Sequence, residues 1–417
     1  MLTTDTFANM RLKQIHTILF LTLALMGAHA EITFRGAWIA TVANIDWPST
    51  TAIGNTEKQQ AEMNWILDSL QAIGINAIIF QVRPTADALY YSELEPVSHW
   101  LTGTQGSWNS QTPWDPLEWT IKQAHQRNME VHVWLNPYRV NLAKTDISTL
   151  SENHIMKKQP DWFWNYGGQW YFDPGLEQTR EWICTIVQDI VQRYPIQAIH
   201  MDDYFYPYPL GKKTLPDEKT FAAHPRGYTD IQEWRRNNVN LAIQEISKTI
   251  KECSAHVQFG ISPFGVWRNA AVDSTGSKTQ AGITNYDNLY ADIRLWIQKG
   301  WIDYVLPQLY WEIGKKAADY EILAHWWANE VKGTNCKLYI GLAPYRLENA
   351  SPKTPWGKGN EINKQMQLNR TIPEITGECF YSTRPLLRNP RHVCDSIKAF
   401  YLSDIQSESD SNIMPWE

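Results

Sequence analysis

Eight short apolar, β-branched segments alternate with longer amphipathic segments along this chain, and this alternation restricts the possible folds more than any other feature. Short runs of this kind suit buried parallel strands, and the 3.6-residue periodicity between them suits helices packed outside. A strand followed by a helix, repeated eight times, predicts an α/β fold, the (β/α)8 TIM barrel, with long loops on its C-terminal face. The predicted strands are residues 34–42, 77–84, 130–139, 198–207, 258–267, 303–311, 337–346 and 378–385.

The segments between these strands carry signals for helix starts. Asp115 and Asp173 each precede a proline, a residue that fits the first position of a helix. The main predicted helices are 57–73, 115–127, 174–193, 230–253, 285–299 and 319–332. By contrast, residues 85–114, 140–173 and 204–229 are long and rich in Trp, Tyr, Gly and Pro. These long loops all follow strands, so they gather on the face where barrel enzymes hold their active sites.

The N-terminus resembles a secretory signal peptide. Arg11 and Lys13 precede an apolar run that ends in the small-residue pattern Ala28-His29-Ala30. The run is about a dozen residues, short of the roughly 20 needed to cross a bilayer, and no lipid-anchoring cysteine follows it. We therefore expect a periplasmic or secreted protein without a membrane span. The predicted organisation is a signal peptide over residues 1–30, the barrel over 31–403 and a C-terminal packing extension over 404–417.

Charge and cysteine content exclude several classes of function. The net charge is −6 and no basic run suits a nucleic-acid backbone, so no nucleic-acid partner is expected. The five cysteines are widely spaced and include no CxxC pair, which argues against a disulfide framework or a zinc ribbon. A single bridge, such as Cys379 to Cys394, remains open for an exported chain. The oligomeric state also remains open.

Aromatic residues are unusually frequent: the chain has 21 Trp and 19 Tyr. Either the core is aromatic-rich, or the protein binds a ligand by stacking, for which sugars are the usual case. Residues 161–175 place Trp162, Trp164, Trp170 and Tyr171 around a Gly-Gly turn, which predicts a hairpin beside the barrel mouth. Several such rings would form an extended cleft for a glycan polymer. Further platforms are predicted at Trp100, Trp114, Trp267 and Trp311.

Polar residues at the C-terminal ends of different strands converge on one pocket in a barrel. Here the strand ends carry Asp46, Gln81, Arg83, Asn136, Arg139, His200, Asp202, Asp203, Ser262, Gln308, Tyr310, Glu312, Tyr345, Arg346, Thr383 and Arg384. Together with the loop aromatics, these residues define the candidate substrate contacts. The candidates are Arg83, Asp87, Asn136, Arg139, His200, Tyr204, Gln308, Trp311, Trp267, Tyr345, Arg346, Trp164 and Trp170.

The stretch HMDDYFYPYP, residues 200–209, contains an adjacent pair of carboxylates. Strand periodicity puts His200 and Asp202 on one face and Ile199 and Met201 on the other, so Asp202 is expected to point into the barrel mouth. Asp203 falls where the strand breaks into its loop. Two carboxylates this close do not both ionise easily, so the pKa of one should rise. A protonated carboxyl beside an ionised one provides the two roles that glycoside cleavage requires.

Two mechanisms remain open for such a pair. A retaining enzyme with its own nucleophile needs a second carboxylate about 5 Å from the acid, and an inverting enzyme needs one further away. Glu312 is the strongest candidate for that carboxylate, and Asp46 and Asp87 are weaker ones.

Alternatively, the substrate supplies the nucleophile, when the carbonyl oxygen of a 2-acetamido group attacks the neighbouring anomeric carbon. Asp203 would then be general acid and base, Asp202 would orient the acetamido group, and Tyr310 would hydrogen-bond its oxygen.

A metal site is a competing interpretation of the same residues. His200, Asp202 and Asp203 could join His132 as ligands of a hydrolytic metal, which would suit a deacetylase or amidase. However, the first predicted strand has no His-x-His, and His132 lies four residues before Asn136, which is expected to be too deep in the barrel. We therefore expect no metal and no other cofactor. A glycan-binding barrel without catalysis is a further alternative.

Motifs over nearly the whole chain after residue 30 resemble the bacterial glycosyl hydrolase-like family ten. The matching stretches are residues 35–49, 80–90, 133–139, 200–209, 259–269, 305–311 and 340–346. The resemblance implies a (β/α)8 hydrolase, and it includes a division-associated member that acts on peptidoglycan glycan strands stripped of their peptides. It therefore implies a substrate of alternating N-acetylglucosamine and N-acetylmuramic acid, which carries the acetamido group. Unlike that member, this chain has no lipobox cysteine, so the same membrane tethering is not expected.

Overall fold

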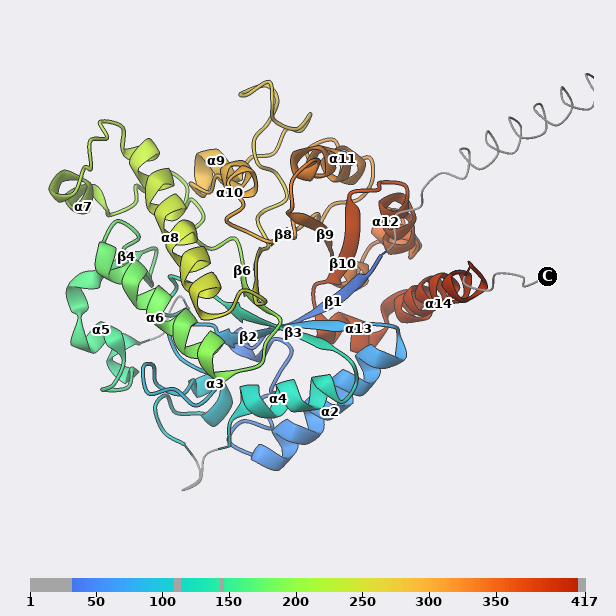
Figure 1. The fold of residues 1–417 in the computed structure, drawn as a ribbon, viewed down its shortest axis with the longest axis horizontal. Coiled ribbons are helices and arrows are strands. Elements are labelled where there is room, and N and C mark those ends of the chain that lie inside the picture. The colour runs from blue at the N-terminus through green and yellow to red at the C-terminus, as the bar shows by residue number, and fades with distance from the viewer. Residues whose placement is uncertain (1–31, 109–113, 143–145, 412–417) are drawn as a thin grey trace, which may run out of the picture.

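Eight parallel strands form a closed barrel at the centre of the molecule (Figure 1). The computed structural model describes residues 32–108, 114–142 and 146–411. The predicted (β/α)8 fold is confirmed, and each observed strand lies within its predicted range except β10, which overlaps its range and starts three residues earlier. Going round the barrel, the strands are β1 (Phe34–Ile39), β2 (Ala77–Arg83), β3 (Glu130–Leu135), β6 (Ala198–Met201), β7 (Gln258–Ile261), β8 (Tyr304–Val305), β9 (Lys337–Leu342) and β10 (Ile375–Phe380).

Helices surround the barrel and cover its outer face (Figure 1). The main ones are α2 (Thr56–Ala72), α4 (Pro116–His125), α6 (Glu177–Arg193), α8 (Ile231–Cys253), α10 (Ile293–Gln298), α11 (Tyr320–Val331), α12 (Glu361–Arg370) and α14 (Val393–Ser411). Short helices lie in the loops: α3 (His99–Thr102), α5 (Ile155–Lys158), α7 (Glu218–Ala223), α9 (Asn285–Asn288) and α13 (Thr383–Arg388). Single 3-10 turns occupy Val42–Asn44, Ile147–Thr149, Pro160–Trp162, Pro344–Leu347, Trp356–Lys358 and Pro390–His392. No helix in the described ranges is long and apolar enough to cross a membrane.

The helix starts test the capping predictions. Asp115 caps α4 as predicted, because its carboxylate accepts hydrogen bonds from the backbone N–H groups of Leu117 and Glu118 at 3.0 Å. The predicted start after Asp173 is wrong, since α6 begins only at Glu177. The Asp173 carboxylate instead binds the N–H of Gly175 at 2.8 Å and the hydroxyl of Thr220, so it stabilises a turn.

The single helix predicted over residues 285–299 is two helices, α9 and α10. Tyr290, between them, has a φ of 54°, which a continuing right-handed helix does not allow. Asp292 then starts α10 by accepting the N–H of Leu295 at 3.4 Å. The amphipathic pattern therefore located the apolar face correctly and missed the break.

The barrel interior is filled by large rings. Phe34 and Tyr339 stack at 4.2 Å between ring centroids, and Tyr304 lies beside them. A Cβ at Gly260 would lie 1.8 Å from the Cζ of Tyr304, so the strand needs glycine there to admit that ring. This packing forms a solid floor beneath the C-terminal mouth of the barrel.

All five cysteines are free, and the bridge left open between Cys379 and Cys394 is not formed. Cys379 belongs to the cluster inside the barrel, whereas Cys394 belongs to the cluster between the strands and the outer helices. The strand wall therefore separates the two sulfur atoms.

The predicted hairpin is confirmed as β4 (Phe163–Tyr166) and β5 (Gln169–Phe172), an antiparallel pair. Gly167 and Gly168 form its turn with φ values of 63° and 88°, which glycine adopts without steric cost. Tyr171 pairs antiparallel with Arg139, so the hairpin is attached to the segment that follows β3. The segment predicted as a signal peptide lies outside the described residues, and α14 runs through the predicted boundary at residue 403 as far as Ser411.

Candidate active site

A cavity of about 210 Å³ lies at the C-terminal mouth of the barrel. It brings together five of the predicted site residues, namely Asp202, Asp203, Tyr204, Gln308 and Tyr310. The rest of its wall consists of Trp38, Trp134, Tyr208, Ser262 and Tyr381. Two carboxylates are thus enclosed by aromatic rings, an amide and hydroxyl groups.

Asp202 directly follows β6 and is 4% exposed. Its carboxylate accepts hydrogen bonds from three N–H groups: Trp134 Nε1 at 3.1 Å, Asn136 Nδ2 at 3.2 Å and the backbone N–H of Tyr204 at 3.3 Å. Burial raises the pKa of Asp202 to about 6, and the neighbouring charge of Asp203 adds to this rise. The three donors hold the carboxylate in one orientation.

Asp203 is 5% exposed and has different partners. One carboxylate oxygen accepts a hydrogen bond from the hydroxyl of Tyr208, and the other accepts one from Gln308 Nε2 at 3.0 Å. Burial raises the pKa of Asp203, and the hydrogen bonds from Tyr208 and Gln308 oppose that rise. Two adjacent buried carboxyls with raised pKa values can hold one proton between them, which provides an acid and a base in one cavity.

Tyr310 lies on the same wall and keeps its proton. Burial raises the pKa of its hydroxyl well above the ordinary value, so the group remains a hydrogen-bond donor. Its ring stacks on Tyr381 with centroids 5.9 Å apart and meets Tyr345 edge to face at 6.0 Å. Tyr345 thus supports Tyr310 from outside the cavity lining.

His200 lies beneath the cavity rather than in its lining. Its Nδ1 is 2.9 Å from the hydroxyl of Tyr304, and its Nε2 is 2.9 Å from Ser262 Oγ. Burial lowers the pKa of His200 well below its usual value, so the ring is neutral. The Nδ1 of His132 also lies 2.9 Å from the hydroxyl of Tyr304. Within the described residues, no group of three or more His, Cys, Asp or Glu side chains converges as a metal site requires.

Arg83 and Asn136 support the cavity from behind. Arg83 is fully buried, forms a two-pronged ion pair with Glu95 at 2.6 and 2.7 Å, and donates to the backbone oxygen of Asn136 at 2.6 Å. Asn136 in turn holds Asp202. Arg83 therefore positions Asn136, and Asn136 positions Asp202.

The candidate nucleophiles lie elsewhere. Glu312 accepts Trp356 Nε1 at 2.9 Å and pairs with Lys315 at 3.3 Å, outside the cavity lining. Burial alone would raise the pKa of Glu312, but hydrogen bonds that include those from Trp356 and Lys315 lower it overall. Asp46 accepts the backbone N–H groups of Ala40 and Arg384 and so joins β1 to the segment after β10.

Several predicted platforms are packing residues. Trp267 is 4% exposed, stacked against Trp326 at 5.9 Å and covered by the Arg294 guanidinium at 4.6 Å. Trp311 packs edge to face on Phe264 at 5.3 Å. Of the other predicted rings, Trp164 is buried against Tyr171 and Trp170 is partly buried on the hairpin. The predicted substrate contact Arg346 is exposed beside Tyr345.

The wall residues Trp38, Trp134, Tyr208 and Tyr381 were not among the predicted site residues. Trp134 lies two positions before Asn136 on β3, so the alternation that placed Asp202 in the mouth also indicates Trp134. Tyr208 belongs to the motif that carries the aspartates, and Tyr381 directly follows β10.

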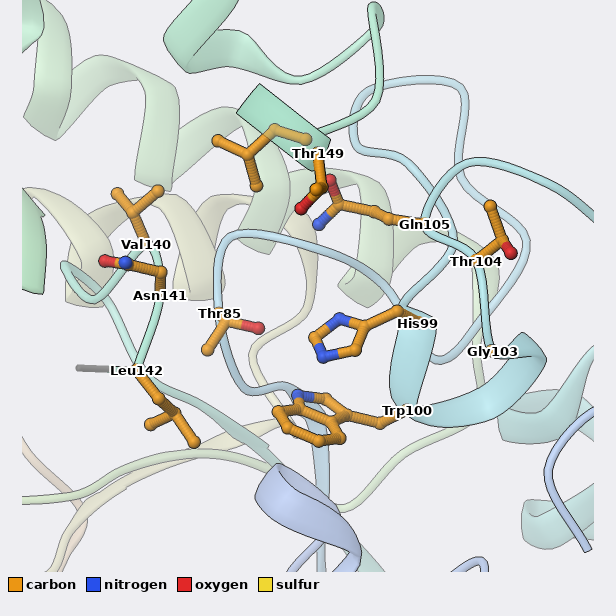
Figure 2. A pocket seen from close by; sticks show the side chains of 11 residues that line it. Thr85, His99, Trp100, Gly103, Thr104, Gln105, Val140, Asn141, Leu142 and Thr149 are labelled. Atoms are coloured by element: carbon orange, nitrogen blue, oxygen red, sulfur yellow. The ribbon is translucent and has the colours of Figure 1, made fainter. Parts of the chain in front are cut away.

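A second cavity, of about 280 Å³, lies between the loops that follow β2 and β3. Figure 2 shows His99 and Trp100 of α3 on one side and Val140, Asn141 and Leu142 on the other. The predicted site residue Asp87 is buried behind this lining. Its carboxylate binds Thr85 Oγ1 at 3.0 Å and Gln105 Nε2 at 3.2 Å, and lies 3.7 Å from His99 Nδ1. Asp87 thus positions three polar groups of the second cavity.

A (β/α)8 barrel with paired buried carboxylates at its mouth has the architecture of a glycoside hydrolase, and comparison with known proteins gives the same class. The chain belongs to the glycosyl hydrolase-like 10 family, whose model matches residues 33–357. It is 45% identical over 371 residues to the glycosyl hydrolase YngK of Bacillus subtilis (strain 168), covering 89% of this chain and 72% of the relative. It is 39% identical over 366 residues to the glycosyl hydrolase DigH of Escherichia coli (strain K12), covering 83% and 82%.

Solved structures with low sequence identity share the fold. The PgaB (BpsB) glycoside hydrolase domain from Bordetella bronchiseptica matches with a TM-score of 0.55 at 8% identity, covering 88% of this chain and 98% of that one. α-L-fucosidase isoenzyme 2 from Paenibacillus thiaminolyticus matches with a TM-score of 0.52 at 12% identity, covering 90% and 50%. At these identities the likeness concerns the barrel alone.

Proposed function

We propose that this protein is an exported glycoside hydrolase that cleaves N-acetylated glycan, with peptide-free peptidoglycan strands as its substrate. The observation that carries the proposal is the adjacent pair Asp202 and Asp203, which share one cavity, have raised pKa values and have separate hydrogen-bond partners. Membership of a glycosyl hydrolase-like family supports the reaction class. Export rests on the predicted signal peptide.

The partners of the two aspartates favour different roles. All three donors to Asp202 are N–H groups, which favour its ionised form. Asp203 has one N–H donor, Gln308 Nε2, and the hydroxyl of Tyr208, which donates to the ionised carboxylate and can accept from the protonated one. Asp203 is therefore better placed to carry the shared proton and to act as the general acid.

The proposed reaction uses the acetamido group of the substrate as nucleophile. Asp203 gives its proton to the glycosidic oxygen while the bond from that oxygen to the anomeric carbon breaks. The acetamido carbonyl oxygen forms a bond to the same carbon, Asp202 accepts the amide N–H, and Tyr310 donates to the carbonyl oxygen. Water then adds to the anomeric carbon, Asp203 takes its proton, and the acetamido group is restored.

The surroundings of the pair support this route over an enzyme nucleophile. Within the described residues, the cavity lining contains no carboxylate besides Asp202 and Asp203. Glu312 and Asp46 are engaged with other partners, and Asp87 is buried behind the second cavity. A thiazoline that mimics the cyclic intermediate should therefore inhibit the enzyme, whereas a mechanism-based fluoro-sugar should leave Glu312 unlabelled. Covalent labelling of Glu312 would contradict the mechanism.

Mass analysis of peptide-free strands after incubation tests the proposed reaction. We expect shorter strands whose new ends carry the mass of one water and whose acetyl groups are intact. Deacetylated strands would indicate a deacetylase, and unchanged strands a binding protein, and either result would contradict the proposal. Aryl 2-acetamido glycosides with one, two or three fluorines on the acetyl group test the mechanism, because fluorine weakens the carbonyl nucleophile and should progressively slow cleavage.

A further inference from the structure

Arg139 differs from the other buried arginines of this protein. It is 8% exposed, and among the described residues no carboxylate lies within ion-pairing distance of its guanidinium. Each of the others has a carboxylate partner: Arg83 with Glu95 at 2.6 Å, Arg180 with Glu245 at 3.2 Å, Arg235 with Asp217 at 2.5 Å and Arg236 with Glu233 at 2.6 Å. An arginine that is held in place without a carboxylate in ion-pairing range among the described residues is suited to bind a ligand of opposite charge.

The backbone around Arg139 fixes its side chain in place. Its N–H donates to Asn136 Oδ1 at 2.9 Å, and its Nε donates to the carbonyl oxygen of Pro84 at 3.1 Å. The guanidinium carbon lies 5.4 Å from the ring centre of Tyr204. These contacts use one of the three guanidinium nitrogens. The two terminal nitrogens, which form the fork that binds carboxylates, have no hydrogen-bond acceptor among the described residues.

Arg139 also lies between the two cavities. Tyr204, which it covers, lines the catalytic cavity, and the next residue, Val140, lines the second cavity. The side chain is close enough to lower the pKa values of Asp202 and Asp203 through its charge. A group bound there would belong to the sugar in the catalytic cavity or to its neighbour along the strand.

We infer that Arg139 is the receptor for a carboxylate carried by the glycan, and that it makes the enzyme selective for acidic strands over neutral ones. This inference rests on the proposed function. The carboxylate is that of the lactyl ether on N-acetylmuramic acid, which is free only after the peptide has been removed. Strands that still carry peptides present an amide at this position, and the fork of Arg139 cannot pair with an amide as it does with an anion. A uronic acid would offer the same chemistry from another source.

The test compares peptide-free strands with the same strands after methyl esterification of their carboxylates. For wild type we expect kcat/KM to fall about 10- to 100-fold on esterification, the range for a charge-assisted hydrogen bond. At the pH optimum of each variant, Arg139→Gln should lose activity on the acidic strands and retain it on the esters, so that the two kcat/KM values converge. Arg139→Lys keeps the charge without the fork and should lie between. Arg388→Gln, which removes an arginine that is 60% exposed, should keep the preference of wild type.

Other outcomes separate the alternatives. Equal losses on acidic and esterified strands, with a shifted pH profile, would mean that Arg139 acts on the aspartate pair, and the inference would be wrong. If wild type prefers hyaluronan oligosaccharides to peptide-free strands, and Arg139→Gln loses that preference, then Arg139 binds a carboxylate, but that of a uronic acid and not that of the lactyl group. Calorimetric binding of both strand types to Asp203→Asn gives the same comparison without turnover. It therefore tests Arg139 even if the proposed reaction fails.

Discussion

The hydrogen bond from Tyr208 to Asp203 gives a prediction about the pH dependence of catalysis. The phenol donates to the ionised form of Asp203 and so lowers its pKa, against the rise caused by burial. Tyr208→Phe removes that donor and leaves Gln308 as the only side-chain donor to Asp203 among the described residues. The pKa of Asp203 should therefore rise further.

The size of the shift follows from the environment of Asp203. A hydrogen bond to a charged group contributes about 1.5 to 3 kcal/mol, and Asp203 is 5% exposed, so solvent replaces little of it. One pKa unit corresponds to about 1.4 kcal/mol, so the shift should be about 1 to 2 units. A general acid works while protonated, and its loss of a proton sets the alkaline limb of the kcat/KM profile. In Tyr208→Phe, this limb should move to higher pH by about 1 to 2 units.

The assay records kcat/KM against pH on peptide-free strands and on an aryl glycoside with a strongly acidic phenol. The phenol departs without protonation, so the shift should appear with strands and vanish with the aryl substrate. Tyr228→Phe is the control, because no hydrogen bond involves the Tyr228 hydroxyl among the described residues. If the alkaline limb stays in place for Tyr208→Phe, or if it moves equally with both substrates, Asp203 is not the general acid.

Two further changes test the barrel and the second cavity. Gly260→Ala puts a Cβ against the ring of Tyr304 and should lower the free energy of unfolding, measured by denaturant titration, by about 1 to 3 kcal/mol. Gly282→Ala adds a Cβ in open space and should cost far less. Similar losses in the two variants would contradict the tight packing of the barrel interior. Asp87→Ala removes the acceptor of Thr85 and Gln105, so KM should rise for long strands and stay unchanged for a short aryl glycoside. Equal effects on both substrates would mean that the second cavity does not bind substrate.

The barrel could be predicted because its cause is local. Each segment has apolar residues at a period of two or of 3.6, and few folds can bury the apolar faces of eight such repeats. The same alternation placed Asp202 in the mouth, where Trp134 and Asn136 hold it. The break at Tyr290 was missed because a single residue with positive φ leaves the periodicity on both sides intact.

The roles of individual side chains depend on partners that are distant in sequence. The strand-end position of Arg83 predicts a sugar contact, but Glu95, twelve residues later, holds its guanidinium. The sequence predicts Trp267 as a platform, but Trp326 stacks on it. Arg139 is the converse case, because it is the buried arginine without a carboxylate in ion-pairing range among the described residues. A pattern along the chain does not contain these pairings.

The central claim is that Asp203 protonates the leaving oxygen while Asp202 holds the acetamido group, and kcat/KM of Asp203→Asn on peptide-free strands tests it most directly. The amide cannot give up a proton, and loss of a general acid typically costs about 10²- to 10⁴-fold. We predict a loss of this size with an unchanged melting temperature, and a much smaller loss on the acidic aryl glycoside. Near-normal cleavage of the strands by a folded Asp203→Asn variant would contradict the account.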